Sequence, residues 1–238
     1  MKLTNRLQKI ADLIDREAKV ADIGTDHGYL PVYLIEKKII DKAIAADINK
    51  LPLENAKAII KEYKYEDKIE TRLGSGLEVL KIGEIDTAII AGMGGVLITE
   101  LLNENLELTK SIDTFVLQPM VDSDELRKYL IENNFVIVDE TIAIEDKRYY
   151  EIIVAKTNGK MSLEKHDDKL GPILKTKDLK AIKQFYNYHI DKNKKIIDKI
   201  KKNSKKDANV RINELEDLIK IMEKVILTNE NKGFYKNN

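Results

Sequence analysis

Residues 20–31 read VADIGTDHGYLP, an apolar run that leads into a glycine turn and then into a helical pattern. The apolar run over residues 19–23 predicts a buried strand, and apolar residues at helical spacing over 30–35 predict a helix. Gly24 can take the tight turn between them and lets a ligand approach the backbone. Strand, glycine turn and helix open a doubly wound α/β sheet, which binds ligands outside the carboxyl ends of its strands.

An acidic residue stands where the dinucleotide fingerprint Gly-x-Gly-x-x-Gly has its second glycine. Gly24 and Gly28 are glycines, but Asp26 lies between them and would repel a pyrophosphate. A carboxylate suits an ammonium or sulfonium group, and S-adenosylmethionine carries both without any phosphate. The turn therefore favours a methyl-donor site and makes a nicotinamide enzyme the least favoured alternative, although similar turns also occur in α/β proteins that bind no nucleotide.

Composition limits the class of protein. The chain has 238 residues, of which 43% are hydrophobic, enough for one α/β domain with an appendage. The chain has no cysteine, which excludes disulfides and thiolate metal sites. No apolar run approaches the roughly 20 residues of a membrane span. We expect a cytoplasmic protein with no metal and no membrane partner, and favour a monomer.

Charge is distributed unevenly along a chain whose net charge is zero. Residues 157–238 carry 20 Lys and Arg against 12 Asp and Glu, hence a net charge of +8, and residues 1–156 carry −8. This asymmetry indicates two parts with different partners, and the basic part could face a polyanion. A solvated lysine-rich helical surface explains the charge equally well.

Three further strand ends supply candidate donor contacts. Asp47 closes an apolar run over residues 43–48, where an acid can accept hydrogen bonds from ribose hydroxyls, although it could instead start a helix. Ser75 follows a short strand over 69–73 and is either an adenine contact or a turn residue. A buried strand from residue 86 ends in three glycines that would let a flat ring approach the backbone: Gly92, Gly94 and Gly95.

The remaining pattern completes one domain and adds a second part. Apolar runs over residues 135–144 and 150–155, joined by a short turn, predict an antiparallel hairpin at the end of the sheet. By analogy of fold, we therefore expect a Rossmann-like sheet of the methyltransferase type over residues 1–156. A polar linker over 157–177 and a basic, coiled-coil-like helical hairpin over 178–230 follow. The expected first seam of this hairpin consists of Leu179, Ile182, Tyr186, His189, Asn193, Ile196 and Ile200.

Four motifs occur in an order typical of one family. They are residues 22–31 (DIGTDHGYLP), 90–95 (IAGMGG), 117–119 (LQP) and 150–151 (YE). With them the chain resembles the bacterial tRNA (adenine(22)-N1)-methyltransferase family over nearly its whole length. The resemblance implies a class I methyltransferase domain with a C-terminal coiled coil, which moves a methyl group from S-adenosylmethionine to N1 of an adenine in the D-loop region of tRNA.

The resemblance also implies roles for residues of the donor site. It implies donor contacts at Asp22, Gly24, Thr25, Asp26 and Gly28, a ribose contact at Asp47, adenine contacts near Ile48, Ser75 and Gly76, and a border to the methyl group at Gly92 and Met93. Two positions depart from the family pattern. Similar sequences often carry an acid or an amide at Ser75 and a glycine at Lys147.

The acceptor side yields a second set of expectations. We expect Asp26 and His27 beside the target base as the candidate catalytic residues, although Asp26 could act only on the donor and His27 could simply be a helix-start residue. The pocket for the base is expected at Gln118, Pro119 and Tyr150. Contacts to the tRNA backbone are expected at Lys201, Lys202, Lys205 and Lys206. The alternatives are a methyltransferase of a small molecule or protein, and a non-catalytic RNA-binding protein.

Overall fold

The computed structural model describes residues 1–177, 180–203 and 209–236 of the chain. It divides the chain into two compact units, Met1–Leu163 and Glu164–Asn238, and each unit is described by itself below. Within the described residues, no helix combines the length and the apolar character that a membrane span requires.

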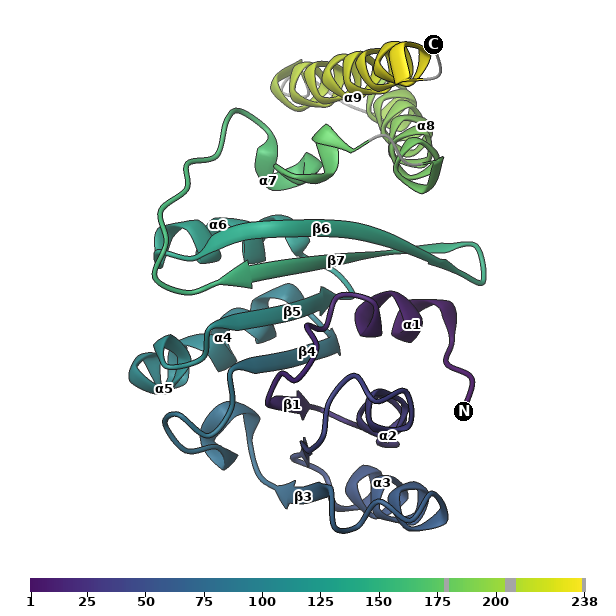
Figure 1. Ribbon diagram of the computed structural model, residues 1–238. Helices are drawn as coiled ribbons and strands as arrows, with labels where there is room; N and C mark the ends of the chain where they lie inside the picture. Colours follow the sequence, from purple (N-terminus) through teal and green to yellow (C-terminus); the bar gives the residue numbers. More distant parts are fainter. Residues whose placement is uncertain (178–179, 204–208, 237–238) are drawn as a thin grey trace. The chain divides into compact units, whose positions relative to one another are not determined.

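The first unit is built on a seven-stranded sheet of order β3-β2-β1-β4-β5-β7-β6 (Figure 1). Strands β1 to β5 are parallel to one another, and β7 is antiparallel to both β5 and β6. This confirms the predicted Rossmann-like sheet with a final antiparallel pair. The strands are β1 (Val20–Ile23), β2 (Ala43–Asp47), β3 (Ile69–Leu73), β4 (Thr87–Met93), β5 (Thr114–Pro119), β6 (Val136–Glu145) and β7 (Arg148–Lys156).

Helices form a layer on each face of the sheet, so its central strands are buried on both sides (Figure 1). Every residue of β1 and β2 is buried, as a parallel sheet between two helical layers requires. One layer holds α1 (Asn5–Ala11), α2 (Tyr29–Glu36) and α3 (Lys50–Glu62). The other holds α4 (Gly95–Glu104), α5 (Leu106–Lys110) and α6 (Ser123–Glu132), while the connection from β3 to β4 contains only the short helix η1 (Gly76–Val79).

A hairpin arm, which we define as residues 141–152, extends beyond the part of β7 that pairs with β5. Strand β7 pairs with β5 only over residues 153–156, whereas its pairing with β6 continues to Arg148. The arm contacts the first turn of α1. Asn5 Nδ2 donates to the Ile144 carbonyl at 2.6 Å, and the Arg6 backbone N–H donates to Glu145 Oε2 at 3.0 Å. The arm therefore holds α1 against the sheet edge.

The arm ends in a two-residue turn formed by Asp146 and Lys147, with φ values of 48° and 62°. Two successive left-handed residues define the hairpin turn that favours glycine at its second position. The backbone of Lys147 is therefore strained in this chain, whereas similar sequences often carry a glycine at this position. We expect Lys147→Gly to raise the free energy of unfolding by up to about 1 kcal/mol. Urea denaturation tests this, and Lys81→Gly, in another exposed loop but without a positive φ, serves as the control.

The second unit contains α7 (Asp167–Leu170), η2 (Leu174–Thr176), α8 (Lys180–Asn203) and α9 (Asn209–Lys236). Part of the expected linker is therefore structured and belongs to this unit. Lys175 Nζ donates to Asp167 Oδ1 at 2.6 Å, and the Tyr186 hydroxyl donates to the Leu170 carbonyl at 2.7 Å. Buried apolar residues within a polar segment, Leu170 and Leu174, explain why residues 164–177 fold onto the helices.

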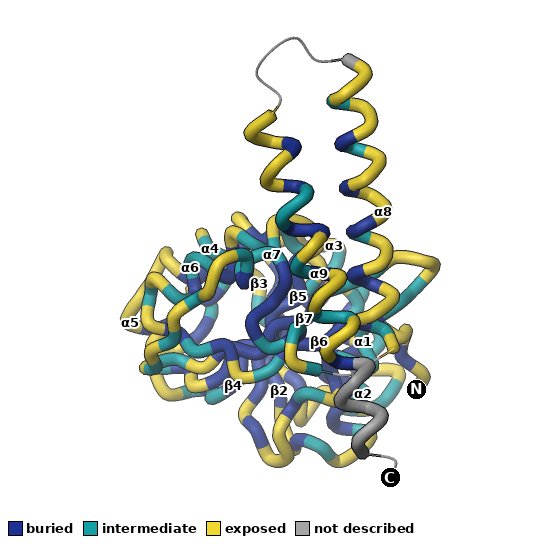
Figure 2. The backbone as a smooth tube through the Cα atoms, turned by 90° about the horizontal axis from the view of Figure 1, so that it is seen from above, coloured by how far each residue is buried: buried dark blue, intermediate teal, exposed yellow. Residues whose placement is uncertain are grey.

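The two long helices pack against each other in antiparallel orientation, each with a buried stripe on one side (Figure 2). Exposed ion pairs join the two helices between Lys194 and Glu223, at 3.3 Å, and between Lys201 and Glu216, at 3.4 Å, as an antiparallel pair requires. The expected seam is partly wrong. Ile190 and Ile197 are buried, whereas Ile196 and Ile200 are only half-buried, and Leu179 lies outside the described residues.

Candidate functional site

A cavity of about 420 Å³ opens at the carboxyl ends of β1, β2 and β4. Strand order reverses between β1 and β4, and ligands of open α/β sheets bind at such a switch point. Seven of the predicted site residues line the cavity: Asp22, Gly24, Thr25, Asp26, His27, Asp47 and Gly92. The other lining residues are Arg6, Leu7, Tyr29, Leu30, Ala91 and Met120.

The turn after β1 is shaped by Gly24, whose φ is +77°. A Cβ at this position would lie 2.4 Å from Met93 Cε, so the methionine side chain occupies the space that a larger residue would need. The backbone N–H groups of Gly24 and Thr25 both donate to the Ala46 carbonyl of β2, at 2.8 and 2.9 Å. Since these donors are engaged within the fold, the turn does not offer them to a pyrophosphate.

Asp22 is one of two buried acids that line the cavity, the other being Asp47. Its Oδ2 accepts a hydrogen bond from Thr25 Oγ1 at 2.6 Å. Burial raises the pKa of the Asp22 carboxyl from 3.8 to about 6, an effect that Asp47 reinforces and that Thr25 and Arg6 oppose. A carboxylate held in this environment gains most from a cationic ligand that restores its charged form.

Two further acids lie around the same cavity. Asp47 closes β2, and its Oδ1 accepts from the Asn49 N–H at 2.8 Å, which leaves the second carboxylate oxygen for a ligand. Asp26 is exposed at a positive φ of 52°, and its Oδ2 lies 2.9 Å from His27 Nδ1. The His27 ring stacks on Tyr29, with ring centroids 5.3 Å apart. The cavity thus combines two buried acids, Asp22 and Asp47, with one exposed acid, Asp26.

The loops after β4 and β5 form the wall of the cavity next to Met120. The Met120 N–H donates to the Met93 carbonyl at 2.8 Å, and the Gly95 N–H donates to the Val121 carbonyl at 2.9 Å. A Cβ at Gly95 would lie 2.1 Å from the Asp122 carbonyl oxygen, so only glycine allows this approach. The first turn of α4 and the loop after β5 expose a set of apolar side chains: Val96, Leu97, Met120 and Val121.

Gln118 was expected in the pocket for the target base, but its side chain is engaged within the fold. Its side chain is fully buried, its Oε1 accepts from Arg6 Nη1 at 2.8 Å, and its Nε2 donates to the Pro119 carbonyl at 2.9 Å. Because both ends of the amide are engaged, a direct contact between Gln118 and a target base does not fit the structure. Pro119 is also buried, whereas Tyr150 is half-buried on the hairpin arm with Arg6 over its ring.

A buried ionic network supports this wall from behind. Arg127 of α6 is fully buried, and its Nε donates to Glu140 Oε1 of β6 at 2.7 Å. Its Nη2 donates to Glu151 Oε2 of β7, and Glu151 Oε1 accepts from Ser123 Oγ at 2.6 Å. Since Ser123 begins α6 directly after the loop that carries Met120, the network fixes the start of that helix to the hairpin.

The remaining predicted residues lie outside the lining of the cavity. Gly28 precedes α2 and packs against Ala56, Met93 lies beneath Gly24, and Ile48 is largely exposed beyond the end of β2. Ser75 and Gly76 follow β3 at the same edge of the sheet, where the Gly74 N–H donates to the Asp47 carbonyl. Lys201 and Lys202 are exposed in the second unit, and Lys205 and Lys206 lie outside the described residues.

Sequence reasoning missed Arg6 and Met120 as lining residues. Arg6 is placed in the first turn of α1, where a positive charge opposes the helix dipole. This unfavourable position was a signal that the residue serves another purpose. Met120 carried no such signal, because its exposure depends on how the loops after β4 and β5 meet.

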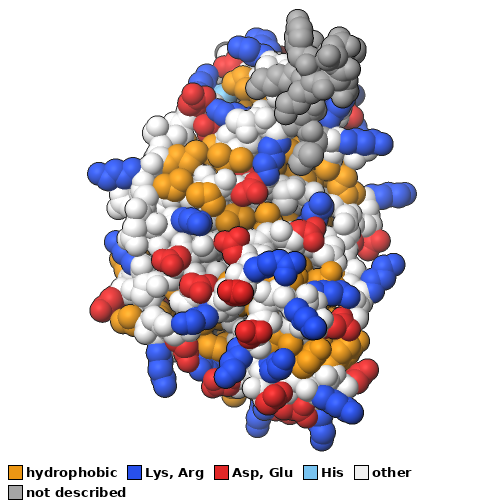
Figure 3. Space-filling model, viewed as in Figure 1, with side chains coloured by type: hydrophobic (Ala, Val, Ile, Leu, Met, Phe, Trp, Pro, Cys, Tyr) orange, Lys and Arg blue, Asp and Glu red, His pale blue; other side chains and the backbone are white. Residues whose placement is uncertain are grey.

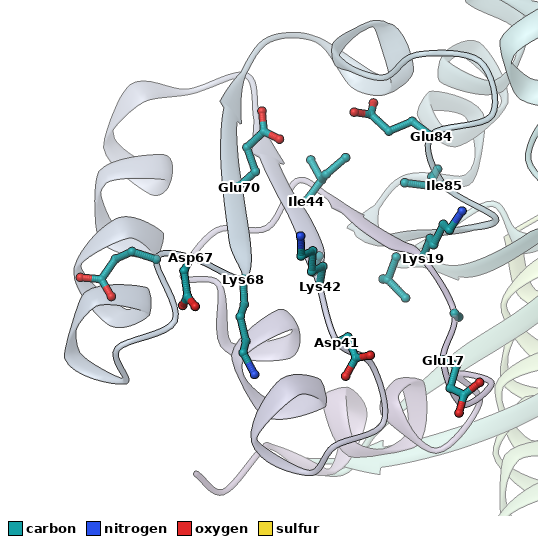
Figure 4. Close-up of a pocket in the computed structure, with 14 residues that line it drawn as sticks. Glu17, Lys19, Asp41, Lys42, Ile44, Asp67, Lys68, Glu70, Glu84 and Ile85 are labelled. Carbon is teal, nitrogen blue, oxygen red and sulfur yellow. The ribbon is translucent and has the colours of Figure 1, made fainter.

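A second and larger hollow, of about 660 Å³, lies at the opposite ends of the same strands (Figure 4). It is lined by residues from the amino ends of β1 and β2, among them Val20 and Ala43. Figure 4 shows acids and lysines interspersed around it, including Glu70, Glu84 and Lys42. Since acids outnumber lysines in its lining and ligands of parallel sheets bind at the other edge, we do not assign it a function.

Comparisons with known proteins agree with this geometry. The family model described as "Methyltransferase domain" matches residues 3–153. The tRNA (adenine(22)-N(1))-methyltransferase of Bacillus subtilis (strain 168) is 38% identical over 156 residues, which are 66% of each chain.

Two solved structures extend the likeness to nearly the whole chain. The B. subtilis M1A22 tRNA methyltransferase TrmK is 31% identical, with a TM-score of 0.82 over 94% of this chain and 99% of that one. The M. capricolum TrmK structure, in complex with S-adenosyl-homocysteine, is 29% identical, with a TM-score of 0.79 over 95% of this chain and 98% of that one. The sheet order, the acid-lined cavity and these likenesses together place the chain in the tRNA (adenine(22)-N1)-methyltransferase family.

Proposed function

We propose that this protein transfers a methyl group from S-adenosylmethionine to N1 of adenine-22 in the D-loop region of tRNA. The observation that carries the proposal is the acid-lined cavity at the switch point between β1 and β4. It occurs in a chain whose B. subtilis relative is named for this activity. Because the substrate is a tRNA, we expect the protein to act in the cytoplasm.

The residues of the cavity fit the methyl donor. Asp22 and Asp26 lie near the turn after β1 and can bind a group that carries an ammonium and a sulfonium charge. Asp47 lies at the end of β2 with one carboxylate oxygen available for ribose hydroxyls. Ile48, Ser75 and Gly76, which follow β2 and β3, are proposed to border the adenine ring, and Gly92 and Met93 to border the methyl group.

The chemistry requires alignment more than proton transfer. When bound, S-adenosylmethionine supplies a methyl group on a positively charged sulfur. Adenine N1 carries a lone pair, so the protein needs no general base to expose it, and the methylated ring is cationic. The protein's tasks are to hold the base in line and to place negative charge near the ring. The exposed carboxylate of Asp26, beside His27, is suitably located for the second task.

The target base has to leave its stack before N1 can reach the cavity. We propose that it enters beside Met120, between the loop after β5 and the hairpin arm that carries Tyr150. The apolar side chains of Val96, Leu97 and Val121 are exposed next to this entry and offer surfaces for unstacked bases. Gln118 and Pro119 contribute indirectly, because Gln118 holds Arg6 at the entry.

Lysines of the second unit are proposed to bind the tRNA backbone. In the view of Figure 3, basic and acidic side chains are intermingled over the first unit. Lys201 and Lys202 are exposed in α8, next to Lys205 and Lys206 in the sequence. Each phosphate that a variant no longer binds should reduce the slope of log Kd against log salt by about one unit. We therefore expect a double change of Lys201 and Lys202 to Gln to reduce the slope by about two and to weaken tRNA binding.

The matched control neutralises two lysines at the opposite edge of the sheet, Lys42 and Lys68, and removes the same net charge. Fluorescence anisotropy with one tRNA at several salt concentrations gives both slopes. Equal slopes for the two double variants would mean that Lys201 and Lys202 are solvated surface residues that bind no phosphate of the tRNA.

The activity itself is tested by nucleoside mass spectrometry of a tRNA transcript incubated with the protein and S-adenosylmethionine. We expect 1-methyladenosine, and we expect none in a transcript with guanine at position 22. Methylation of the second transcript would refute the proposed position. Methyl transfer to a small molecule or protein but not to tRNA would refute the proposed substrate.

A further inference from the structure

Arg6 is the only lysine or arginine among the described residues that line the donor cavity. The other charged groups there are the carboxylates of Asp22, Asp26 and Asp47, besides the imidazole of His27. A single guanidinium among three acids requires an explanation, because the acids alone would already serve a cationic ligand. The first turn of a helix is also an unfavourable place for a positive charge.

Three strands hold Arg6 in place, two of them through its side chain. Arg6 Nη1 donates to the buried Oε1 of Gln118 on β5 at 2.8 Å. The Arg6 backbone N–H donates to Glu145 of β6, and Arg6 Cζ lies 5.7 Å from the centre of the Tyr150 ring on β7. Gln118 presents its oxygen to Arg6 because its Nε2 is engaged by the Pro119 carbonyl. The guanidinium is therefore oriented before any ligand arrives, which lowers the entropy lost when it binds one.

The guanidinium of Arg6 lies on the side of the cavity where the amino-acid end of the donor is expected. A Cβ on Gly92 would lie 3.9 Å from Arg6 Nη1, so the guanidinium lies above the carboxyl end of β4. Asp47, the proposed ribose contact, lies at the end of β2, on the other side of β1. A donor with its ribose at Asp47 therefore directs its amino-acid end toward β4 and Arg6.

The charged groups of S-adenosylmethionine match the three acids and the arginine of the cavity. S-adenosylmethionine carries a sulfonium, an ammonium and one carboxylate. Three acids complement the two positive groups but repel the carboxylate unless a cation faces it. We propose that Arg6 binds the carboxylate of the methyl donor and is oriented for this by Gln118. This inference rests on the proposed use of S-adenosylmethionine and extends it to a specificity-determining residue.

Arg6 recognises an oxyanion, and the other source of one is a phosphate of the tRNA. Binding measured without tRNA separates the two sources. The test uses isothermal titration calorimetry with S-adenosylmethionine and with its decarboxylated form, which keeps the sulfonium and the ammonium but has no carboxylate. Each ligand is titrated into the full-length protein, into Arg6→Gln and into Arg16→Gln, a control at an exposed arginine of the same unit.

We expect the wild-type protein to bind S-adenosylmethionine about tenfold or more tightly than its decarboxylated form, since a charge-assisted hydrogen bond between the guanidinium and the carboxylate is made only by the former. Arg6→Gln should lose this preference by weakening only the binding of S-adenosylmethionine, and Arg16→Gln should keep it. Thermal melts of the free variants confirm that they fold.

Two results would overturn the proposal. An equal loss of affinity for both ligands in Arg6→Gln would mean that the residue supports the cavity without contacting the carboxylate. Unchanged affinity for S-adenosylmethionine with weakened tRNA binding would assign Arg6 to a phosphate. Failure of the proposed function is distinguishable, because a protein that binds the donor through Arg6 but methylates another substrate leaves this inference intact.

Discussion

Replacing Arg127 by Ala is expected to lower the free energy of unfolding by about 3–5 kcal/mol, because the change leaves buried carboxylates without their counter-charge. Glu140 is fully buried and accepts from Arg127 Nε, and Glu151 is largely buried and accepts from Nη2. Burial of an uncompensated charge is among the largest penalties that a single substitution can cause. Urea denaturation at pH 7.5, followed by circular dichroism, measures the loss.

The neighbouring residue provides a matched control for this prediction. Lys128 is a half-exposed residue of the same helix that pairs with Glu125 three positions earlier. Lys128→Ala removes one positive charge, as Arg127→Ala does, but should change stability by less than about 0.5 kcal/mol. A loss of less than about 1 kcal/mol for Arg127→Ala would show that the network does not hold α6 to the hairpin.

A pH-dependent loss of donor affinity is the second large expected effect. Because the pKa of Asp22 is about 6 in the free protein, its carboxyl is mostly charged at pH 7.5 and mostly protonated at pH 5. A donor that binds the carboxylate through its ammonium group must displace the proton at the lower pH. We expect the apparent Kd for S-adenosylmethionine to rise about tenfold between pH 7.5 and pH 5.

The Asp22→Asn variant isolates this contribution. It should bind the donor more weakly at pH 7.5 and should lose most of the pH dependence, because no proton is exchanged at this position. Calorimetry at four pH values measures both effects, and Asp41→Asn, an exposed acid at the opposite edge of the sheet, is the control. A wild-type Kd that is constant from pH 7.5 to 5 would exclude Asp22 as the carboxylate that binds the donor.

The same substitution should stabilise the free protein. Folding raises the pKa of Asp22 above its value of 3.8 in the unfolded chain, so the folded state binds more protons between about pH 4 and 6. The free protein therefore loses stability as the pH rises through this window, by at most about 3 kcal/mol. An asparagine side chain at this position carries no charge and avoids this loss. A variant that is more stable but binds the donor less well is expected where burial of an acid serves function.

The predictable part of the site depends on local sequence. The turn at Gly24, the acids Asp22 and Asp26 and the strand-ending Asp47 could be identified because each is placed by its own strand and the turn that follows. We could predict that these residues lie together, because parallel strands present their carboxyl ends at one edge of the sheet. The final antiparallel hairpin was predictable for a similar reason, because its turn is short.

The parts that escaped prediction depend on contacts between distant segments. Arg6 reaches the cavity only because the hairpin arm holds α1, and Gln118 turned out to be buried because α1 supplies its partner. In α8, two adjacent residues, Ile196 and Ile197, allow two phases of the same apolar pattern, and packing against α9 selects the phase that buries Ile197. Periodicity alone does not resolve such a choice.

The ligand preference of the cavity tests the account most directly. Isothermal titration calorimetry at pH 7.5 compares S-adenosylmethionine with NAD, the ligand that the same sheet binds when the turn after its first strand cradles a pyrophosphate. We predict a one-to-one isotherm with S-adenosylmethionine and no heat beyond dilution with NAD. A protein that bound NAD and gave no heat with S-adenosylmethionine would contradict the account.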